Sequence, residues 1–146
     1  MARVLIKRLN PNVELPVYKT NGASGMDLMA FLNEAITLKP KNSCLVPTGI
    51  SVAFPSEFEI QIRPRSGLAA KNSISVLNTP GTIDSDYRGE IKVILINLSK
   101  EPQIINDGDR IAQMVFQSVE KVDWELVVAL DETQRGVGGF GHTGKK

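Results

Sequence analysis

The run Glu57-Phe58-Glu59-Ile60-Gln61-Ile62 alternates strictly between polar and apolar side chains. A period of two places successive side chains on opposite faces of an extended chain, so the run predicts a β-strand with one buried face. Pro55 and Pro64 flank it and limit its extent on both sides. This stretch therefore points to a β fold.

Other apolar runs on both sides of this stretch have the same character. Residues 90–96 begin with alternation and end as a continuous apolar run, as in a strand buried on both faces. Shorter apolar runs predict further strands at 4–6, 36–38, 45–54, 74–77 and 111–119. A late strand is predicted because five apolar residues share one parity, namely Val122, Trp124, Leu126, Val128 and Leu130. Turn signals separate these runs at 21–22, 55–56, 85–86 and 107–109, a spacing typical of an antiparallel sandwich or barrel.

Helices have little room between the prolines. The longest interval before Pro102 runs from Pro16 to Pro40 and contains two glycines. One exception is residues 66–72, a single helical stretch that Ser66 is placed to cap. We therefore expect an all-β, antiparallel fold with one short helix.

Size and composition are those of one globular domain. The chain has 146 residues and a mass of 16.0 kDa, with 42% hydrophobic and 23% charged residues. No apolar run approaches the roughly 18–20 residues that cross a bilayer. The start, MARVLIKRLNP, reaches two basic residues before a long apolar stretch forms and so does not match a cleaved secretory signal. We expect a cytoplasmic protein with no membrane partner.

Charge and residue counts exclude several classes of function. A net charge of +1 removes the main argument for a DNA- or RNA-binding surface. Cys44 is the only cysteine and His142 the only histidine. One chain therefore cannot form an intrachain disulfide, a Cys/His zinc site or a histidine-based catalytic triad. The chemistry must use carboxylates, hydroxyls, arginines, backbone amides or a bound ion.

Residues 135–146 differ in composition from the rest, which divides the chain into a β domain at 1–134 and a C-terminal arm at 135–146. The arm holds five of the 12 glycines and two apolar side chains, so it cannot form a core of its own. It is either a frayed tail or a segment that closes over a phosphorylated aromatic ligand. The second interpretation uses Arg135, Phe140, His142 and Thr143 together with exposed backbone amides.

Two internal segments carry candidate chemistry. In 63–69, two arginines end a strand and Ser66-Gly67 opens the helix. The positive charges and the free amides at a helix start suit phosphate oxygens, but the same pattern is also typical of a surface turn with solvated arginines. In 78–90, Asp-Ser-Asp is good turn chemistry, yet Asp84 in a concave hairpin could instead deprotonate a water. In that case Tyr87 offers a flat floor for a sugar, and the Asn78 amide matches the edge of a pyrimidine.

The combination of segments resembles a known family. Ile83-Asp84-Ser85-Asp86-Tyr87-Arg88-Gly89 and the glycine-rich stretch 135–141, RGVGGFG, are the most specific parts. Five segments resemble, in order, the five motifs of the trimeric deoxyuridine triphosphatases (dUTP diphosphatases): 23–30, 63–69, 81–90, 108–116 and 135–144. The resemblance implies a jelly-roll-like domain that forms a homotrimer with shared active sites. It also implies hydrolysis of dUTP to dUMP and pyrophosphate, by attack of water on the α-phosphorus.

The resemblance extends to individual positions in the hairpin. Asp84 matches the carboxylate that positions and activates the water, and Tyr87 matches the ring beneath the deoxyribose, where a ribose 2′-hydroxyl would clash. The uracil pocket is matched by Asn78 and by backbone groups of Thr82, Ile83 and Asp84. Lys92 matches a family position near the nucleotide.

Other positions match the groups that hold the phosphates. Arg65, Ser66 and Gly67 match the phosphate-binding segment, and Gln113 matches a further phosphate contact. Asp27 matches a residue that helps to place Mg²⁺ through the water molecules of the ion, which makes Mg²⁺ the expected cofactor.

In the arm, Arg135 and Phe140 match the groups that hold the γ-phosphate and stack on uracil. Two alternatives remain open at this point: a dCTP deaminase-like enzyme of the same fold, and a non-enzymatic trimeric nucleotide-binding module.

Overall fold

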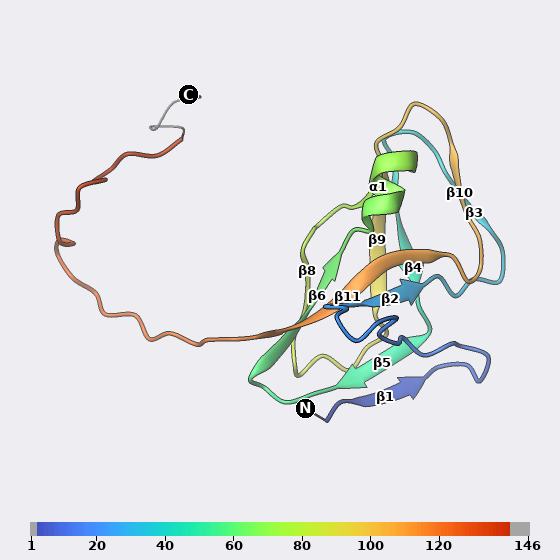
Figure 1. The fold of residues 1–146 in the computed structure, drawn as a ribbon, viewed down its shortest axis with the longest axis horizontal. Coiled ribbons are helices and arrows are strands. Elements are labelled where there is room, and N and C mark those ends of the chain that lie inside the picture. Colours follow the sequence, from blue (N-terminus) through green and yellow to red (C-terminus); the bar gives the residue numbers. More distant parts are fainter. Residues whose placement is uncertain (1–2, 141–146) are drawn as a thin grey trace.

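The computed structural model describes residues 3–140, which form eleven β-strands and one helix (Figure 1). The elements are β1 (Leu5–Arg8), β2 (Met26–Met29), β3 (Ile36–Leu38), β4 (Ser43–Pro47), β5 (Ile50–Ala53), β6 (Phe58–Arg63), α1 (Ser66–Asn72), β7 (Ile74–Val76), β8 (Gly81–Ile83), β9 (Lys92–Asn97), β10 (Gln103–Ile105) and β11 (Arg110–Ser118). The predicted all-β class with one short helix is confirmed.

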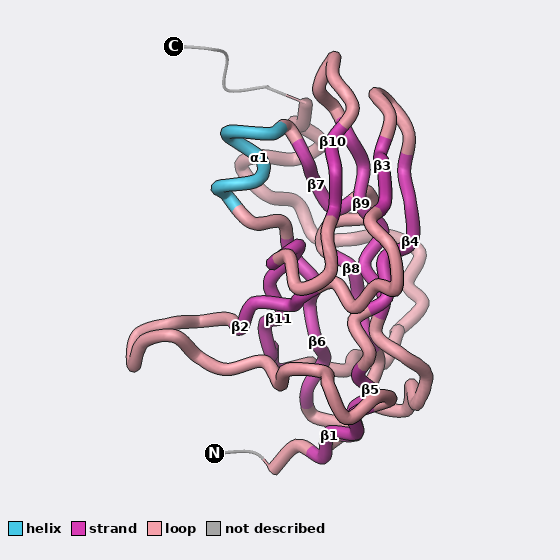
Figure 2. The backbone as a smooth tube through the Cα atoms, turned by 90° about the vertical axis from the view of Figure 1, so that its right-hand side faces the viewer, coloured by secondary structure: helices cyan, strands magenta, loops and turns pink. Residues whose placement is uncertain are grey.

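Strand pairing is antiparallel throughout these residues and largely nested. β2 pairs with β11, β3 with β10 and β4 with β9, so that early strands lie beside late ones. The largest sheet has the order β2-β11-β6-β8, and a second sheet has the order β4-β9-β7. Figure 2 shows these strands from the side, with α1 at one margin of the body. Nested pairing of this kind is the jelly-roll arrangement.

One hydrophobic core joins the two larger sheets. Leu28, Ile60 and Ile111 come from the four-stranded sheet, and each is at most 1% exposed. Val46 and Leu95 come from the three-stranded sheet and are fully buried in the same cluster. The alternation seen in the sequence therefore places apolar side chains between the sheets and leaves the strand ends free to carry functional groups. No helix in the described part of the chain is long and apolar enough to span a membrane.

Two local expectations are wrong. The run 45–54 is not one strand, because the chain turns at Thr48-Gly49 and Gly49 has φ +71°. β4 and β5 consequently belong to different sheets. Ser66 does not cap α1: the capping position is Arg65, which is extended (φ −88°, ψ 127°) and forms no side-chain capping bond. Ser66 is therefore the first helical residue, one position too late to cap the helix.

The strand predicted over 122–130 is also not formed. Beyond β11 the chain leaves the body as an extended segment (Figure 1), here called the C-terminal segment, residues 119–140. Trp124 is 92% exposed and Leu126 is 99% exposed. A β-strand needs the backbone groups of a neighbouring strand. After the N–H of Val119, which donates to the carbonyl of Glu57 over 2.9 Å, this segment pairs with none of the described strands of its own chain.

Candidate active site

A pocket of about 290 Å³ lies between β8, the turn that follows it, and β9. The sequence predicted a hairpin here, but β8 pairs with β6 whereas β9 pairs with β4 and β7, so the two strands lie in different sheets. We call this cavity the hairpin pocket, after the predicted hairpin. Six residues expected at the site line it: Asn78, Thr82, Ile83, Asp84, Tyr87 and Lys92. The structure therefore brings together, in one cavity, the positions that the resemblance assigns to the base, the sugar and the attacking water, except Phe140 of the arm.

The pairing of β8 with β6 places the turn that follows β8. Thr82 lies opposite Gln61 and Ile83 opposite Ile60, so β8 runs along the edge of the large sheet and delivers Asp84 just beyond it. The turn is closed by the backbone N–H of Tyr87, which donates to the carbonyl of Asp84 over 3.1 Å. Asp84 is exposed at the wall of the pocket, so its carboxylate is accessible to water and substrate.

Asn78 reaches the pocket across a glycine. A Cβ atom at Gly81 would lie 3.2 Å from the Asn78 side-chain nitrogen and 3.3 Å from Ile62 Cβ. The Asn78 amide therefore lies directly against the backbone of Gly81. A side chain at position 81 would push the amide away, so the glycine keeps its donor and acceptor at the pocket wall.

Asp27 forms the centre of a second group of polar side chains. Its Oδ1 accepts from Arg65 Nε at 3.0 Å, and its Oδ2 lies 3.7 Å from Arg110 Nη1. The Asp27 side chain is only 10% exposed. Arg65 also donates to the carbonyl of Arg110 over 3.2 Å. We call these three residues the arginine cluster.

The remaining phosphate-binding candidates adjoin this cluster. Gln113 on β11 is the register partner of Asp27 on β2 and is exposed. Ser66 and Gly67 follow Arg65 in the first turn of α1, and a Cβ at Gly67 would meet no atom within 4 Å. The backbone at Gly67 is therefore open to the approach of a ligand, as a phosphate site requires.

Within one chain these groups remain apart. β2 and β8 are the two edges of the four-stranded sheet, and three strand spacings correspond to roughly 14 Å. Phe140 in the C-terminal segment is fully exposed, and Arg135 Nε donates to the carbonyl of Gly138 over 2.8 Å. His142 and Thr143 lie outside the described residues.

The carboxylates of these groups fit a magnesium ion only if most of its ligands come from the substrate and water. Among residues 3–140, no three His, Cys, Asp or Glu side chains form a group that could hold a metal. Mg²⁺ commonly takes its ligands from substrate phosphates and water, with one or two protein carboxylates at most. Asp27 and Asp84 suit that mode. The Asp84 carboxylate is exposed, and the Asp27 carboxylate, which faces Arg65 and Arg110, would contact the ion through water. The thiol of Cys44, whose pKa is raised by burial, lies on β4 and lines neither group.

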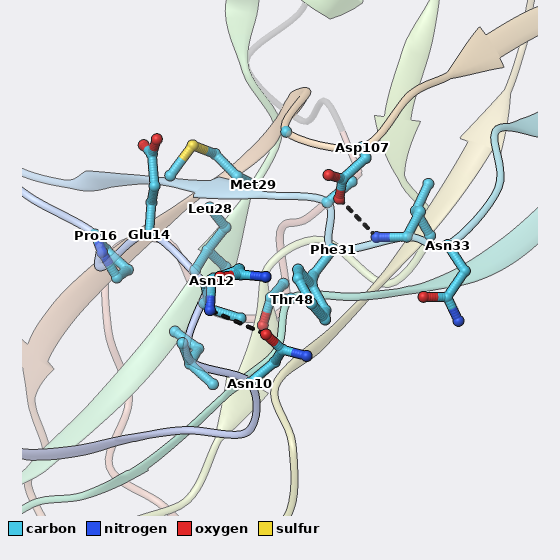
Figure 3. A pocket seen from close by; sticks show the side chains of 15 residues that line it. Asn10, Asn12, Glu14, Pro16, Leu28, Met29, Phe31, Asn33, Thr48 and Asp107 are labelled. Atoms are coloured by element: carbon cyan, nitrogen blue, oxygen red, sulfur yellow. Dashed lines mark hydrogen bonds between the residues drawn. The ribbon is translucent and has the colours of Figure 1, made fainter.

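A larger pocket, of about 520 Å³, is elsewhere (Figure 3). None of the expected site residues lines it. Two polar groups at its wall are already paired: Asn10 Oδ1 accepts from the N–H of Asn12 at 2.9 Å, and Asp107 Oδ1 accepts from the N–H of Leu32 at 2.8 Å (Figure 3). Size alone therefore does not identify the site in this molecule.

Sequence reasoning missed two polar residues of the site. Glu90 lines the hairpin pocket, where its carboxylate accepts from the Gly49 N–H at 2.9 Å and lies 3.6 Å from Lys92 Nζ. Arg110 joins the arginine cluster. Both lie in segments that the sequence analysis had singled out, but their partners are distant along the chain, so no local pattern marked their roles.

Comparisons with known proteins agree on one family. The model of the dUTPase family matches residues 11–144. A deoxyuridine 5′-triphosphate nucleotidohydrolase of Fusobacterium nucleatum is 53% identical over 146 residues and covers 99% of this chain and 100% of that protein. A protein of the same name from Rickettsia rickettsii is 56% identical over 145 residues, which cover 99% of this chain and 98% of that protein.

Solved structures show the same fold at low identity. The dUTPase of Staphylococcus bacteriophage 80alpha with dUPNHPP superposes with a TM-score of 0.84 at 22% identity, covering 97% of this chain and 98% of that one. A mutant dUTPase of the S. aureus phage phi11, described with a structural Mg(II) ion, superposes with a TM-score of 0.80 at 19% identity. The match covers 89% of this chain and 99% of that one.

Proposed function

The chain belongs to the dUTPase family, and from that premise we propose that it hydrolyses dUTP to dUMP and pyrophosphate. The observation that carries the proposal is the hairpin pocket, which gathers an accessible carboxylate, an aromatic ring and a side-chain amide. These are the groups needed to handle water, a sugar and a pyrimidine edge, respectively.

Asp84 is the proposed general base. Its carboxylate is exposed at the pocket wall, where it can accept a proton from a water molecule. Loss of that proton makes the water a better nucleophile for the α-phosphorus, and cleavage then releases pyrophosphate. Among the described residues, no histidine or cysteine lines the pocket, so a carboxylate is the group available there for this step.

Asn78 and Tyr87 are proposed to select the nucleoside. The Asn78 amide can donate and accept together, with backbone groups of 82–84 completing the pairing to uracil. Cytosine would leave these groups mismatched, and unpaired buried polar groups are costly. The Tyr87 ring supports the deoxyribose, and Lys92 lies at the start of β9 beside the nucleotide.

Arg65, Ser66, Gly67 and Gln113 are proposed to hold the phosphates. Arg65 retains guanidinium donors beyond the Nε that it gives to Asp27, and planar guanidinium groups suit phosphate oxygens. Bound Mg²⁺ would neutralise part of the triphosphate charge, with Asp27 contacting it through water. Arg135 and Phe140 would close over the γ-phosphate and uracil when substrate is bound.

We further propose that the active unit is a homotrimer. The arginine cluster, the hairpin pocket and the C-terminal segment lie apart in one chain, so a complete site requires parts from several copies. The C-terminal segment carries exposed apolar side chains at alternate positions from 122 to 130. In the described chain β1 pairs only with β5, so its other edge is free. An apolar groove of about 500 Å³ lies beside β1, lined partly by Ile6, Tyr18 and Phe116. A second copy's segment fits that groove and the free strand edge.

Pyrophosphate release tests the activity. The protein is assayed with Mg²⁺ against dUTP, dTTP, dCTP and UTP at equal concentrations. We expect strong preference for dUTP, because fixed hydrogen bonds reject cytosine while shape rejects the thymine methyl and the ribose hydroxyl. Comparable kcat/KM for dCTP or UTP would contradict the proposal. Ammonia release from dCTP would instead support the deaminase alternative, and tight binding without turnover would support the nucleotide-binding module.

A further inference from the structure

We propose that Gly89 is a positioning residue that sets sugar specificity by providing the seat on which the Tyr87 ring rests. A hydrogen bond from the ring hydroxyl holds it there. The inference rests on the proposed function, since it concerns how the same pocket distinguishes deoxyribose from ribose.

The seat is evident from the space around Gly89. A Cβ atom built there would lie 2.5 Å from Tyr87 Cζ and 2.9 Å from Cε2, and would also collide with the hydroxyl oxygen. Cβ atoms in proteins essentially never approach other heavy atoms to less than 3.0 Å. The Tyr87 ring therefore lies directly against the glycine backbone, in a position that only glycine at 89 permits.

The hydroxyl forms a tether next to this seat. Tyr87 Oη donates to the carbonyl of Glu90 over 2.9 Å. The residue is 44% exposed and does not belong to the hydrophobic core cluster. Packing against the core therefore does not hold the ring, and its position depends on the seat and the tether.

The carbonyl of Glu90, which accepts the tether, is held in place by hydrogen bonds to a neighbouring part of the fold. The Glu90 carboxylate accepts from the Gly49 N–H at 2.9 Å. The N–H of Ile91 donates to the carbonyl of Ile50 over 2.9 Å, and Thr48 Oγ1 donates to the carbonyl of Ile91 over 2.5 Å. Ile91 is fully buried. Two bonds to the turn between β4 and β5 and one to the first residue of β5 thus hold the backbone that carries the tether.

A fixed ring matters because ribose and deoxyribose differ by a single hydroxyl. Exclusion by shape depends on the distance between the ring and C2′, and a displacement of the ring by even an ångström would open room for the hydroxyl. The seat and the tether would hold that distance constant. They make Gly89 a determinant of sugar specificity that acts through Tyr87.

The test is the ratio of kcat/KM for dUTP to kcat/KM for UTP. Gly89→Ala is expected to lower this ratio about tenfold or more, since selection against one added hydroxyl amounts to about 10² in pockets that rely on shape. The melting temperature should change little, because an exposed side chain can rotate away from the new methyl group. Gly22→Ala is the matched control, since a Cβ there meets nothing within 4 Å, and it should retain the wild-type ratio.

Two further variants separate positioning from general damage. Tyr87→Phe keeps the ring and removes the tether, and should lower the ratio on its own. In a Tyr87→Ala background, Gly89→Ala should cause no further change, because the group it displaces is gone. A wild-type ratio in Gly89→Ala or in Tyr87→Phe would overturn the inference, as would an undiminished effect of Gly89→Ala without the ring.

Binding keeps the two proposals distinguishable. Calorimetry with dUMP and UMP measures sugar discrimination without turnover, and the same losses are expected in the ratio of their dissociation constants. A wild-type protein that does not hydrolyse dUTP would overturn the proposed function. Unchanged nucleotide discrimination in Gly89→Ala and Tyr87→Phe would overturn the positioning role alone.

Discussion

Asp84 shows how a residue's function depends on its position relative to the end of a strand. β8 finishes one residue before it, and the following turn leaves the carboxylate exposed in the hairpin pocket. Asp86 lies two residues further in the same turn and does not line the pocket. Two similar side chains in one turn therefore have different access to substrate, which makes them a natural pair for a test.

Asp84→Asn is expected to lower kcat by about 10²–10⁴ with little change in KM, because an amide cannot take the proton of the attacking water. Steady-state pyrophosphate release measures both constants. Asp86→Asn removes the same charge from the same turn and should retain nearly all activity. Equal losses in both variants would mean that the turn, and not the base, had been damaged.

At the scale of elements, the turn between β4 and β5 is the anchor of the site. Gly49 has φ +71°, a left-handed conformation that side chains disfavour. A Cβ there would lie 2.5 Å from Val13 Cγ2 and 3.2 Å from the Phe31 ring. The same residue donates to Glu90, so the geometry of this turn is transmitted to the hairpin pocket.

Gly49→Ala should reduce the free energy of unfolding by about 2–4 kcal/mol, through backbone strain and crowding of buried side chains. Urea unfolding at fixed protein concentration measures the change, since association affects apparent stability. Gly22→Ala serves again as the control, because its surroundings are open. If the urea midpoint of Gly49→Ala equals that of the wild type, the turn accommodates the methyl group without loss of stability.

At the scale of the whole molecule, the separation of the three groups predicts complementation between chains. An Asp84→Asn chain and a chain truncated before Arg135 should each be nearly inactive. Refolded together in equal amounts, they should yield about a quarter of sites with an intact Asp84 and an intact arm, by random assortment in a closed three-fold ring.

The measurement is dUTP hydrolysis by the mixture, compared with the two variants refolded separately. Recovery near a quarter of wild-type activity is the expected result. If each arm closed the site of its own chain, no mixed site could contain both parts, and verified mixed trimers would show no recovery.

Much of the fold and site followed from local pattern. Alternation at 57–62 predicted β6, and three residues of the IDSDYRG stretch, Ile83, Asp84 and Tyr87, line the hairpin pocket, as the family resemblance implied. The short strands β8 (GTI) and β10 (QII) were not predicted, because neither has the apolar-polar-apolar order that marks the equally short β3 (ITL) and β7 (ISV). The alternation at 122–130 predicted a strand that has no neighbour within its own chain.

The sequence by itself determined the β class, the short helix and the identity of the chemical groups, because side-chain period and residue type are local properties. Tertiary structure decided which groups meet. Arg110 reaches Asp27 and Glu90 reaches Gly49 only after the strands have paired. Both contacts join residues at least 41 positions apart along the chain and depend on strand register and turn geometry, which no short window of sequence encodes.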